Sequence, residues 1–174
     1  MITFKAKLYV IGEWVILRVP EAASEQLPSR GQVMVQGTFN GTPFESPLEP
    51  DGNWSHWLNP SNALLKQAGV APGDMVELSI EATKKWPEPA VPGDIQKGIV
   101  EDKTVGELWH QITPMARWEW IRWIRSTNKD ETRSKRIEVA RDKMIKGWRR
   151  PCCWNRNLST VPEVSKGGRL LALA

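Results

Sequence analysis

The sequence predicts an α+β protein in which a small closed β-barrel is followed by a helical segment. Up to about residue 85, short runs of alternating polar and apolar residues are separated by turn signals, as is typical of a small barrel. After about residue 104, apolar residues recur at helical spacing. The chain has 174 residues, of which 40% are hydrophobic. This suffices for one domain, or for a small domain with an appendage.

The expected barrel strands are separated by residues that favour tight turns. Asn40-Gly41 is the strongest hairpin signal, and Asp51-Gly52 marks a second turn. Asn59-Pro60-Ser61 predicts the start of a short helix over 62–68, which Gly69 ends. The strands themselves are expected at 4–10, 15–19, 33–37, 54–58 and 76–81, and Asn40-Gly41 separates two extended runs.

The rest of the chain divides by composition. Residues 86–98 hold three prolines and two glycines, so a linker or a crossing strap is expected there. Helices are expected over 104–111, from Thr113-Pro114 to about 126, and from Asn128 or Asp130 to 146, where Gly147 ends the last one. The predicted organisation is a barrel domain at 1–85, a linker at 86–103, a helical region at 104–150 and a C-terminal tail at 151–174.

Charge is distributed unevenly along the chain. Residues 1–112 carry 9 basic and 14 acidic side chains, whereas residues 113–150 carry 12 basic and 5 acidic ones. This asymmetry favours either packing of the helical segment on the barrel or a polyanionic partner such as nucleic acid. The basic residues of the last helix spread around it and alternate with Glu138 and Asp142, which argues against a helix that reads a nucleic-acid groove.

Targeting signals and disulfides are not expected. No run approaches 18 apolar residues, so no membrane span is predicted. The N-terminal MITFKAKLYV alternates polar and apolar residues and lacks the apolar core of a signal peptide. The two cysteines are neighbours and cannot connect distant segments. These features together predict a cytoplasmic protein.

Two stretches resemble bacterial families. GTFNGTPFESPLEPDG followed by GVAPGDMVELSIE resembles a domain of unknown function, and this resemblance implies a double-split β-barrel. LWHQITPMARWEWIRWIRSTNKDETRSKRIEVARDKMIKGWRR resembles the helical region of the bacteriocin-protection (YdeI/OmpD-associated) family, through WIRST, ETRSKRI and the basic end after Gly147. The family pattern usually has an Ala-Lys pair where this chain has Thr127-Asn128. The resemblance implies a link to antimicrobial-peptide tolerance and no known reaction.

The last helix is predicted to bury one face, which comprises Ile137, Ala140, Met144 and Trp148. Arg133 and Arg136 each lie four residues before a member of this stripe, so both guanidinium groups are expected toward the interior. A buried guanidinium needs a partner. The partner is either an internal carboxylate, such as Glu77 or Glu81 of the barrel, or a ligand carboxylate or phosphate in a crevice between barrel and helices.

Tryptophan is abundant, with ten residues. The candidate ligand contacts among them are Trp118, Trp120 and Trp123 of the second long helix. Trp120 and Trp123 lie on the broad apolar face of that helix, most of which is expected to be core. Trp118 falls off this face and is expected to contact the C-terminal tail. Stacking on Arg122, or contact with a ligand or partner, is the alternative.

Catalytic residues and cofactors are not expected. Neither His56 nor His110 has a nucleophile or carboxylate at a recognisable spacing. The sequence also has no glycine-rich phosphate loop, no nucleophile elbow and no H-E-x-x-H motif. Both histidines are therefore expected to be structural.

Cys152 and Cys153 follow Arg149 and Arg150. The first interpretation is that one cysteine packs as a small hydrophobe while the other faces outward. The second is a redox thiol, because neighbouring arginines favour the thiolate form of an exposed cysteine. The third is a metal site completed by His56 and His110, although a tetrahedral zinc site needs four ligands and these four are scattered over three segments.

The sequence therefore favours a non-enzymatic bacterial module that binds a small anionic ligand or peptide between barrel and helices. Arg133, Arg136 and the tryptophans would line this crevice. Two alternatives stay open. One is a nucleic-acid-binding protein that uses the basic helical segment, and the other is a thiol redox or metal-binding protein that acts through Cys152-Cys153.

Overall fold

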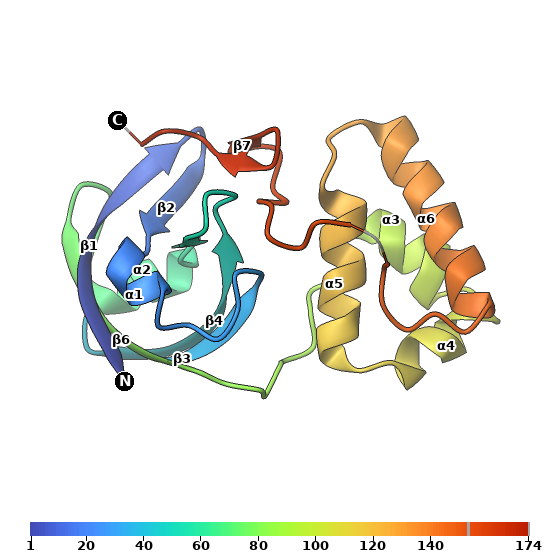
Figure 1. The fold of residues 1–174 in the computed structure, drawn as a ribbon, viewed down its shortest axis with the longest axis horizontal. Coiled ribbons are helices and arrows are strands. Elements are labelled where there is room, and N and C mark those ends of the chain that lie inside the picture. The colour runs from blue at the N-terminus through green and yellow to red at the C-terminus, as the bar shows by residue number, and fades with distance from the viewer. Residues whose placement is uncertain (153, 174) are drawn as a thin grey trace. The chain divides into compact units, whose positions relative to one another are not determined.

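The computed structural model describes residues 1–152 and 154–173, which divide into two units (Figure 1). The barrel unit comprises residues 1–85 and two segments of the tail, which begin at Arg156 and Glu163. The helical unit comprises the described residues of 86–155 and the short segment Thr160–Pro162. The predicted α+β architecture, a barrel followed by helices, is confirmed.

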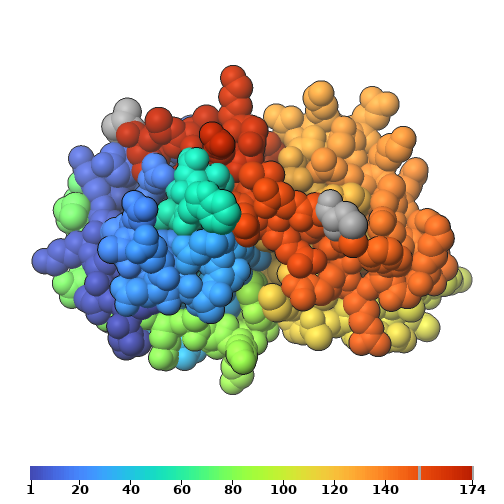
Figure 2. Space-filling model, in the orientation of Figure 1, coloured from blue at the N-terminus to red at the C-terminus, as the bar shows by residue number. Residues whose placement is uncertain are grey.

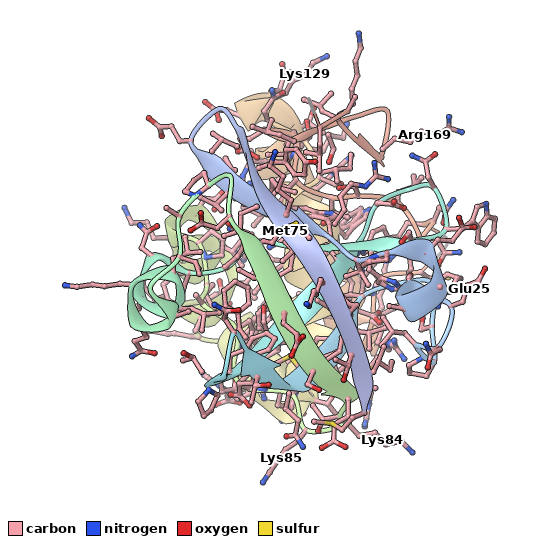
Figure 3. The ribbon with its side chains drawn as sticks, turned by 90° about the vertical axis from the view of Figure 1, so that its left-hand side faces the viewer. Glu25, Met75, Lys84, Lys85, Lys129 and Arg169 are labelled. Atoms are coloured by element: carbon pink, nitrogen blue, oxygen red, sulfur yellow. The ribbon has the colours of Figure 1, made fainter. Side chains whose placement is uncertain are left out.

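Antiparallel strands of the barrel unit close into a barrel in the order β1-β2-β5-β4-β3-β6. They are β1 (Ile2–Ile11), β2 (Trp14–Arg18), β3 (Val33–Phe39), β4 (Thr42–Pro50), β5 (His56–Leu58) and β6 (Met75–Ala82). Figure 3 looks onto β1 and β6, which cross the near side of the barrel. Met75, at the start of β6, is exposed on this outer surface.

The alternation of apolar and polar residues along β1 decides which side chains enter the barrel. Phe4, Ala6 and Leu8 are buried, and the residues between them are exposed. The β3–β4 hairpin turns at Asn40-Gly41, where φ is 49° and 82°. Two positive φ angles give a turn whose twist matches that of the flanking strands, so the predicted hairpin is confirmed.

Short helices complete the first 85 residues of the barrel unit, namely α1 (Glu21–Ser24) and α2 (Asn62–Ala68). At the start of α2, the Ser61 Oγ accepts a hydrogen bond from the Leu64 N–H at 3.1 Å. At its end, Gly69 adopts a left-handed conformation with φ of 67°. The N-cap and the C-terminal glycine are the two signals that predicted this helix.

The helical unit begins earlier than the sequence predicts. Its elements are α3 (Gly93–Ile95), the π-helical turn η1 (Gln96–Val100), α4 (Val105–Gln111), α5 (Pro114–Arg125) and α6 (Asp130–Ile145). The segment 86–103, expected to be a linker, is therefore helical from Gly93 to Val100. A Cβ on Gly98 would lie 2.7 Å from the Ile137 Cγ2, so glycine permits the close approach of η1 to α6. Over residues 1–152 and 154–173, none of the helices has the length and apolar character to cross a membrane.

The core of the helical unit lies between α4, α5, α6 and η1. Its buried residues include Ile99, Trp109, Trp120, Ile121, Ile124, Ile137, Ala140 and Met144. The predicted stripe of α6 is thus confirmed for Ile137, Ala140 and Met144. Trp148, the fourth residue of that stripe, is instead 40% exposed. The reason is that α6 ends at Ile145 and Gly147, with φ of 94°, turns the chain away.

The C-terminal tail forms a small hairpin on the barrel unit, made of β7 (Ser165–Lys166) and β8 (Arg169–Leu170). The Leu170 N–H donates to the Asp51 carbonyl at 2.9 Å, and the Ser159 N–H donates to the Gly168 carbonyl at 2.7 Å. Figure 2 shows this red segment against the blue and teal surface of the barrel unit. The bond to Asp51 joins the hairpin to the turn that follows β4.

Candidate functional site

Arg133 of α6 is held in an ion pair. Its Nε and Nη2 donate to the Asp94 Oδ2 and Oδ1 at 2.8 and 2.9 Å, which is a bidentate geometry. These hydrogen bonds lower the pKa of Asp94 from its ordinary value. An internal ion pair is therefore present, but the carboxylate belongs to α3 and not to the expected Glu77 or Glu81. The Nε and Nη2 groups of Arg133, which could otherwise bind a ligand carboxylate or phosphate, are therefore occupied by Asp94.

Arg136 has different surroundings. Its Nη1 donates to the Trp123 carbonyl at 2.9 Å and to the Ser126 Oγ at 2.6 Å, at the C-terminal end of α5. The guanidinium carbon lies 5.7 Å from the centroid of the Trp123 ring, within cation–π range. Burial lowers the pKa of Arg136 from its ordinary value, although an arginine stays protonated in proteins.

No carboxylate of the described residues pairs with Arg136, and both of its hydrogen bonds come from Nη1. The Nε and Nη2 groups together form the edge of the guanidinium that binds carboxylates and phosphates in a bidentate manner. On Arg133 this same edge is occupied by Asp94. On Arg136 it is open to a ligand.

The side chain of Arg136 lines an open groove of about 330 Å³ on the helical unit, which we call the α5–α6 groove. Its lining residues are Trp123, Glu131, Thr132, Lys135, Arg136 and Val139. Two cations and one carboxylate face this space, so the local charge is positive. Trp123 and Val139 supply an apolar wall beside the guanidinium. The groove can thus receive a planar anion against Arg136 and an adjoining apolar group against Trp123.

Trp123 is the member of the three candidate tryptophans that lines this groove. Trp120 is fully buried, and its Nε1 donates to the Arg149 carbonyl at 2.9 Å. The rings of Trp120 and Trp123 meet edge to face, with centroids 6.1 Å apart. Trp120 therefore supports Trp123 from the core and is not placed to touch a ligand.

Trp118 contacts the segment before the helices, whereas the sequence favoured the tail. Its Nε1 donates to the Pro87 carbonyl at 2.8 Å, and its ring lies 6.0 Å from that of Trp86. Arg122, expected to lie beside Trp118, is only 1% exposed. Its guanidinium carbon instead lies 5.2 Å from the centroid of the Trp154 ring. Tail and α5 thus meet through Arg122 and Trp154.

His56 is buried in the barrel unit and has a partner at each ring nitrogen. Its Nε2 lies 2.8 Å from the Gly31 carbonyl, and its Nδ1 lies 2.6 Å from the Ser24 Oγ. Because a carbonyl only accepts, Nε2 carries the proton, and Nδ1 accepts from the Ser24 hydroxyl. Arg30 also donates to the Ser24 Oγ, at 3.2 Å. This arrangement holds the neutral imidazole and joins α1 to β5.

The barrel unit is therefore expected to lose stability on acidification through His56. Burial, and to a lesser extent the charge of Arg30, lowers the pKa of His56 below its ordinary value of 6.5. The unfolded chain then binds more protons than the folded one as the pH falls through about 6.5, so the free energy of unfolding decreases. Urea unfolding at pH 7.5 and pH 5 measures this loss.

The matched variant is His56→Gln, whose amide retains a donor for Gly31 but does not titrate. It is expected to be about 1–2 kcal/mol less stable than the parent at pH 7.5, because the hydrogen bond at Nδ1 is lost. Between pH 7.5 and pH 5 it should lose less stability than the parent. An identical pH dependence in the two proteins would show that other groups cause the acid sensitivity.

The metal candidates do not assemble into a site in the described part of the chain. Residues 1–152 and 154–173 contain no group of three or more His, Cys, Asp or Glu that could hold a metal ion. Cys152 is exposed, while Cys153 lies outside the described residues. His110 lies in the last turn of α4, where it is exposed and its carbonyl accepts from Arg117. Arg150, the expected neighbour of the thiols, pairs with Glu119.

Thr132, Lys135 and Val139 of the groove are not among the residues that the sequence predicts to bind a ligand. Together with Arg136 they follow the spacing i, i+3, i+4 and i+7, which marks one face of a helix. This spacing was readable from the sequence. The spacing alone does not predict a binding face, because three of the four residues are polar and a polar helical face is ordinarily a solvated one.

Comparison with protein families matches two regions of the chain. Residues 4–80 match the Domain of unknown function (DUF1905), and residues 88–147 match the family described as Bacteriocin-protection, YdeI or OmpD-Associated. The two resemblances read from the sequence are confirmed, in the same order along the chain. No curated protein matches the chain. The α5–α6 groove lies entirely within the second matched region.

Proposed function

We propose that this chain, in which a domain of unknown function precedes a bacteriocin-protection region, is a non-enzymatic binding module for a small anion or an acidic peptide. The binding site is the α5–α6 groove. The observation that best supports this proposal concerns Arg136. Its guanidinium lies over Trp123 and has no carboxylate partner among the described residues. The groove is built from the helical unit alone, whereas the sequence placed the ligand between barrel and helices.

The chemistry of the groove favours an oxyanion. Nη1 of Arg136 is fixed by the Trp123 carbonyl of α5 and by the hydroxyl of Ser126, which follows α5, so the guanidinium is held in place before a ligand arrives. A preorganised fork loses little conformational entropy when it binds a carboxylate or phosphate. Lys135 adds a second positive charge, and Trp123 offers a surface for an apolar or peptide group.

Arg136→Lys is expected to weaken binding of inorganic phosphate or glutarate at least about five-fold, because a lysine keeps the charge but has no bidentate edge. The titration is followed by ¹H–¹⁵N NMR at constant ionic strength, through the arginine Nε groups of the parent and through the Trp123 indole N–H of both proteins, because Trp123 lines the groove. In the parent protein, the Arg136 signal should move and reach saturation. Assignment comes from the Arg136→Lys spectrum, in which that signal is missing.

Arg169→Lys is the matched control, because Arg169 points into solvent on the tail hairpin and does not line the groove (Figure 3). It should leave phosphate and glutarate binding unchanged. The proposal fails if the Arg136 signal never saturates with either probe, or if Arg136→Lys binds both as tightly as the parent.

Nucleic-acid binding has less support than a small anion, because many basic side chains of the helical unit are already neutralised. The pairs are Arg117–Glu88, Arg133–Asp94, Arg141–Asp102, Lys146–Asp142 and Arg150–Glu119. A surface that binds a phosphate backbone presents unpaired cations in a row. Salt-dependent binding of a single-stranded oligonucleotide, tighter than that of phosphate, would favour this alternative.

A further inference from the structure

A second pocket of the helical unit lies where α4 and α6 end. Its volume is about 140 Å³, and its lining residues are Leu108, Gln111, Ile112, Met144, Gly147, Trp148 and Arg149. Met144 and Ile112 are buried, at 2% and 7% exposure, and they form an apolar interior. An apolar cavity of about 150 Å³ in another protein is large enough for benzene. The pocket therefore has room for one ring or one branched alkyl group.

The wall of this pocket is a fixed turn. The Gly147 N–H donates to the Met144 carbonyl and the Trp148 N–H donates to the Lys143 carbonyl, both at 3.0 Å. The Arg149 carbonyl accepts from the buried Trp120 Nε1 at 2.9 Å. The backbone of residues 147–149 is thus anchored at successive positions, and the pocket exists before any ligand binds.

The rim of the pocket is aromatic and positively charged. Trp148 remains 40% exposed, with the Lys143 Nζ 4.4 Å from the centroid of its ring. The guanidinium of Arg149 forms no ion pair or hydrogen bond with residues 1–152 or 154–173. No acidic side chain is among the lining residues. An anionic group is therefore the complementary partner for this rim.

We infer that this pocket binds carboxylates that bear a single ring or branched alkyl group. The apolar group lies against Met144 and Ile112, and the carboxylate meets Arg149 at the rim. Two sources present this chemistry, namely a free aryl or alkyl carboxylate and the C-terminal residue of a peptide. The pocket and the α5–α6 groove share no lining residue, so this inference does not depend on the proposed function.

The test uses the full chain labelled with ¹³C at its five methionine methyl groups. The probe is 3-phenylpropionate. Its ring current should move the Met144 methyl signal until saturation, while the signals of Met34 and Met75 in the barrel unit stay in place. The alcohol 3-phenylpropanol has the same ring without the charge and should bind more weakly.

Variants separate the two halves of the pocket. Arg149→Gln should weaken 3-phenylpropionate about three-fold, as expected for an exposed charge, and leave 3-phenylpropanol unchanged. Leu108→Phe should fill the apolar interior and abolish binding of both probes. Lys103→Gln removes a charge that is also exposed but does not line the pocket, and it should change neither affinity. Met115 lies in α5 of the helical unit and does not line the pocket, so an unmoved Met115 signal shows that the helical unit of each variant is folded.

Two further probes show whether the natural ligand is a free carboxylate or a peptide C-terminus. They are the peptide acetyl-Ala-Ala-Phe and its C-terminal amide. If the peptide acid binds tighter than both 3-phenylpropionate and the amide, the site takes a peptide C-terminus; if it binds more weakly than 3-phenylpropionate, the site takes a free carboxylate. The inference is overturned if the Met144 signal does not saturate with 3-phenylpropionate. It is equally overturned if acid and alcohol bind the parent alike, or if Arg149→Gln changes nothing.

Discussion

Replacing Arg117 by methionine is expected to destabilise the helical unit by about 4 kcal/mol. Arg117 of α5 is 8% exposed. Its Nε donates to the Trp109 carbonyl at 3.0 Å, and its Nη2 donates to the His110 and Ile112 carbonyls at 3.2 and 2.7 Å. One guanidinium thus satisfies carbonyl groups at the end of α4 that have no helical partner. Methionine fills similar space but leaves these carbonyls without a donor.

Glu88→Gln is the control for this prediction. Glu88 pairs with the Nη1 of Arg117, but its side chain is 67% exposed. An exposed ion pair contributes at most about 1 kcal/mol, so Glu88→Gln should have a small effect. Hydrogen exchange resolved by residue measures both variants, because it reports the opening free energy of α4 and α5 directly. Similar small losses in the two variants would show that the ion pair, and not the carbonyl cap, is the role of Arg117.

The helix starts and turns that the sequence predicted correctly depend on interactions between residues close together in the chain. Thr113-Pro114 predicted the start of α5, where the Thr113 Oγ1 accepts from the Ala116 N–H at 3.2 Å. Asn40-Gly41 predicted the β3–β4 hairpin for the same kind of reason. In each case the decisive residues lie within a few positions of each other. Their geometry is set by backbone preferences that hold before the chain folds.

The ion pair that Arg133 forms could not be predicted, because its two side chains are distant in the sequence. Arg133 and Asp94 are 39 residues apart, and the carboxylate that Arg133 meets depends on how η1 and α3 pack on α6. The helical wheel placed Arg133 and Arg136 on one face, yet only Arg133 meets a carboxylate. A wheel reports the direction of a side chain and says nothing about the neighbouring element. The carboxylate partner of Arg133, and the lack of one at Arg136 among the described residues, therefore required the structure.

Gly52→Ala is expected to displace the tail hairpin from the barrel unit at a cost of about 3 kcal/mol or more. Gly52 has a φ of 79°, and a Cβ at this position would lie 2.1 Å from the Gly168 carbonyl oxygen. Both atoms belong to backbone or are bonded directly to it, so rotation of a side chain cannot relieve the clash. The amides of Leu170 and Ser159 should lose hydrogen-exchange protection, because they donate to Asp51 and to Gly168 itself.

Gly12→Ala separates this clash from the cost of the backbone conformation. Gly12 also has a positive φ, of 58°, but a Cβ there meets no atom within 4 Å. Its replacement should cost about 1–2 kcal/mol from conformation alone and leave the tail amides protected. The additional loss in Gly52→Ala then measures the docking of the tail. If the two variants are equally stable and the tail amides stay protected in both, the contact between Gly52 and Gly168 does not hold the hairpin. If the predicted difference appears, the barrel unit depends on a segment almost 90 residues beyond the matched region that ends at residue 80.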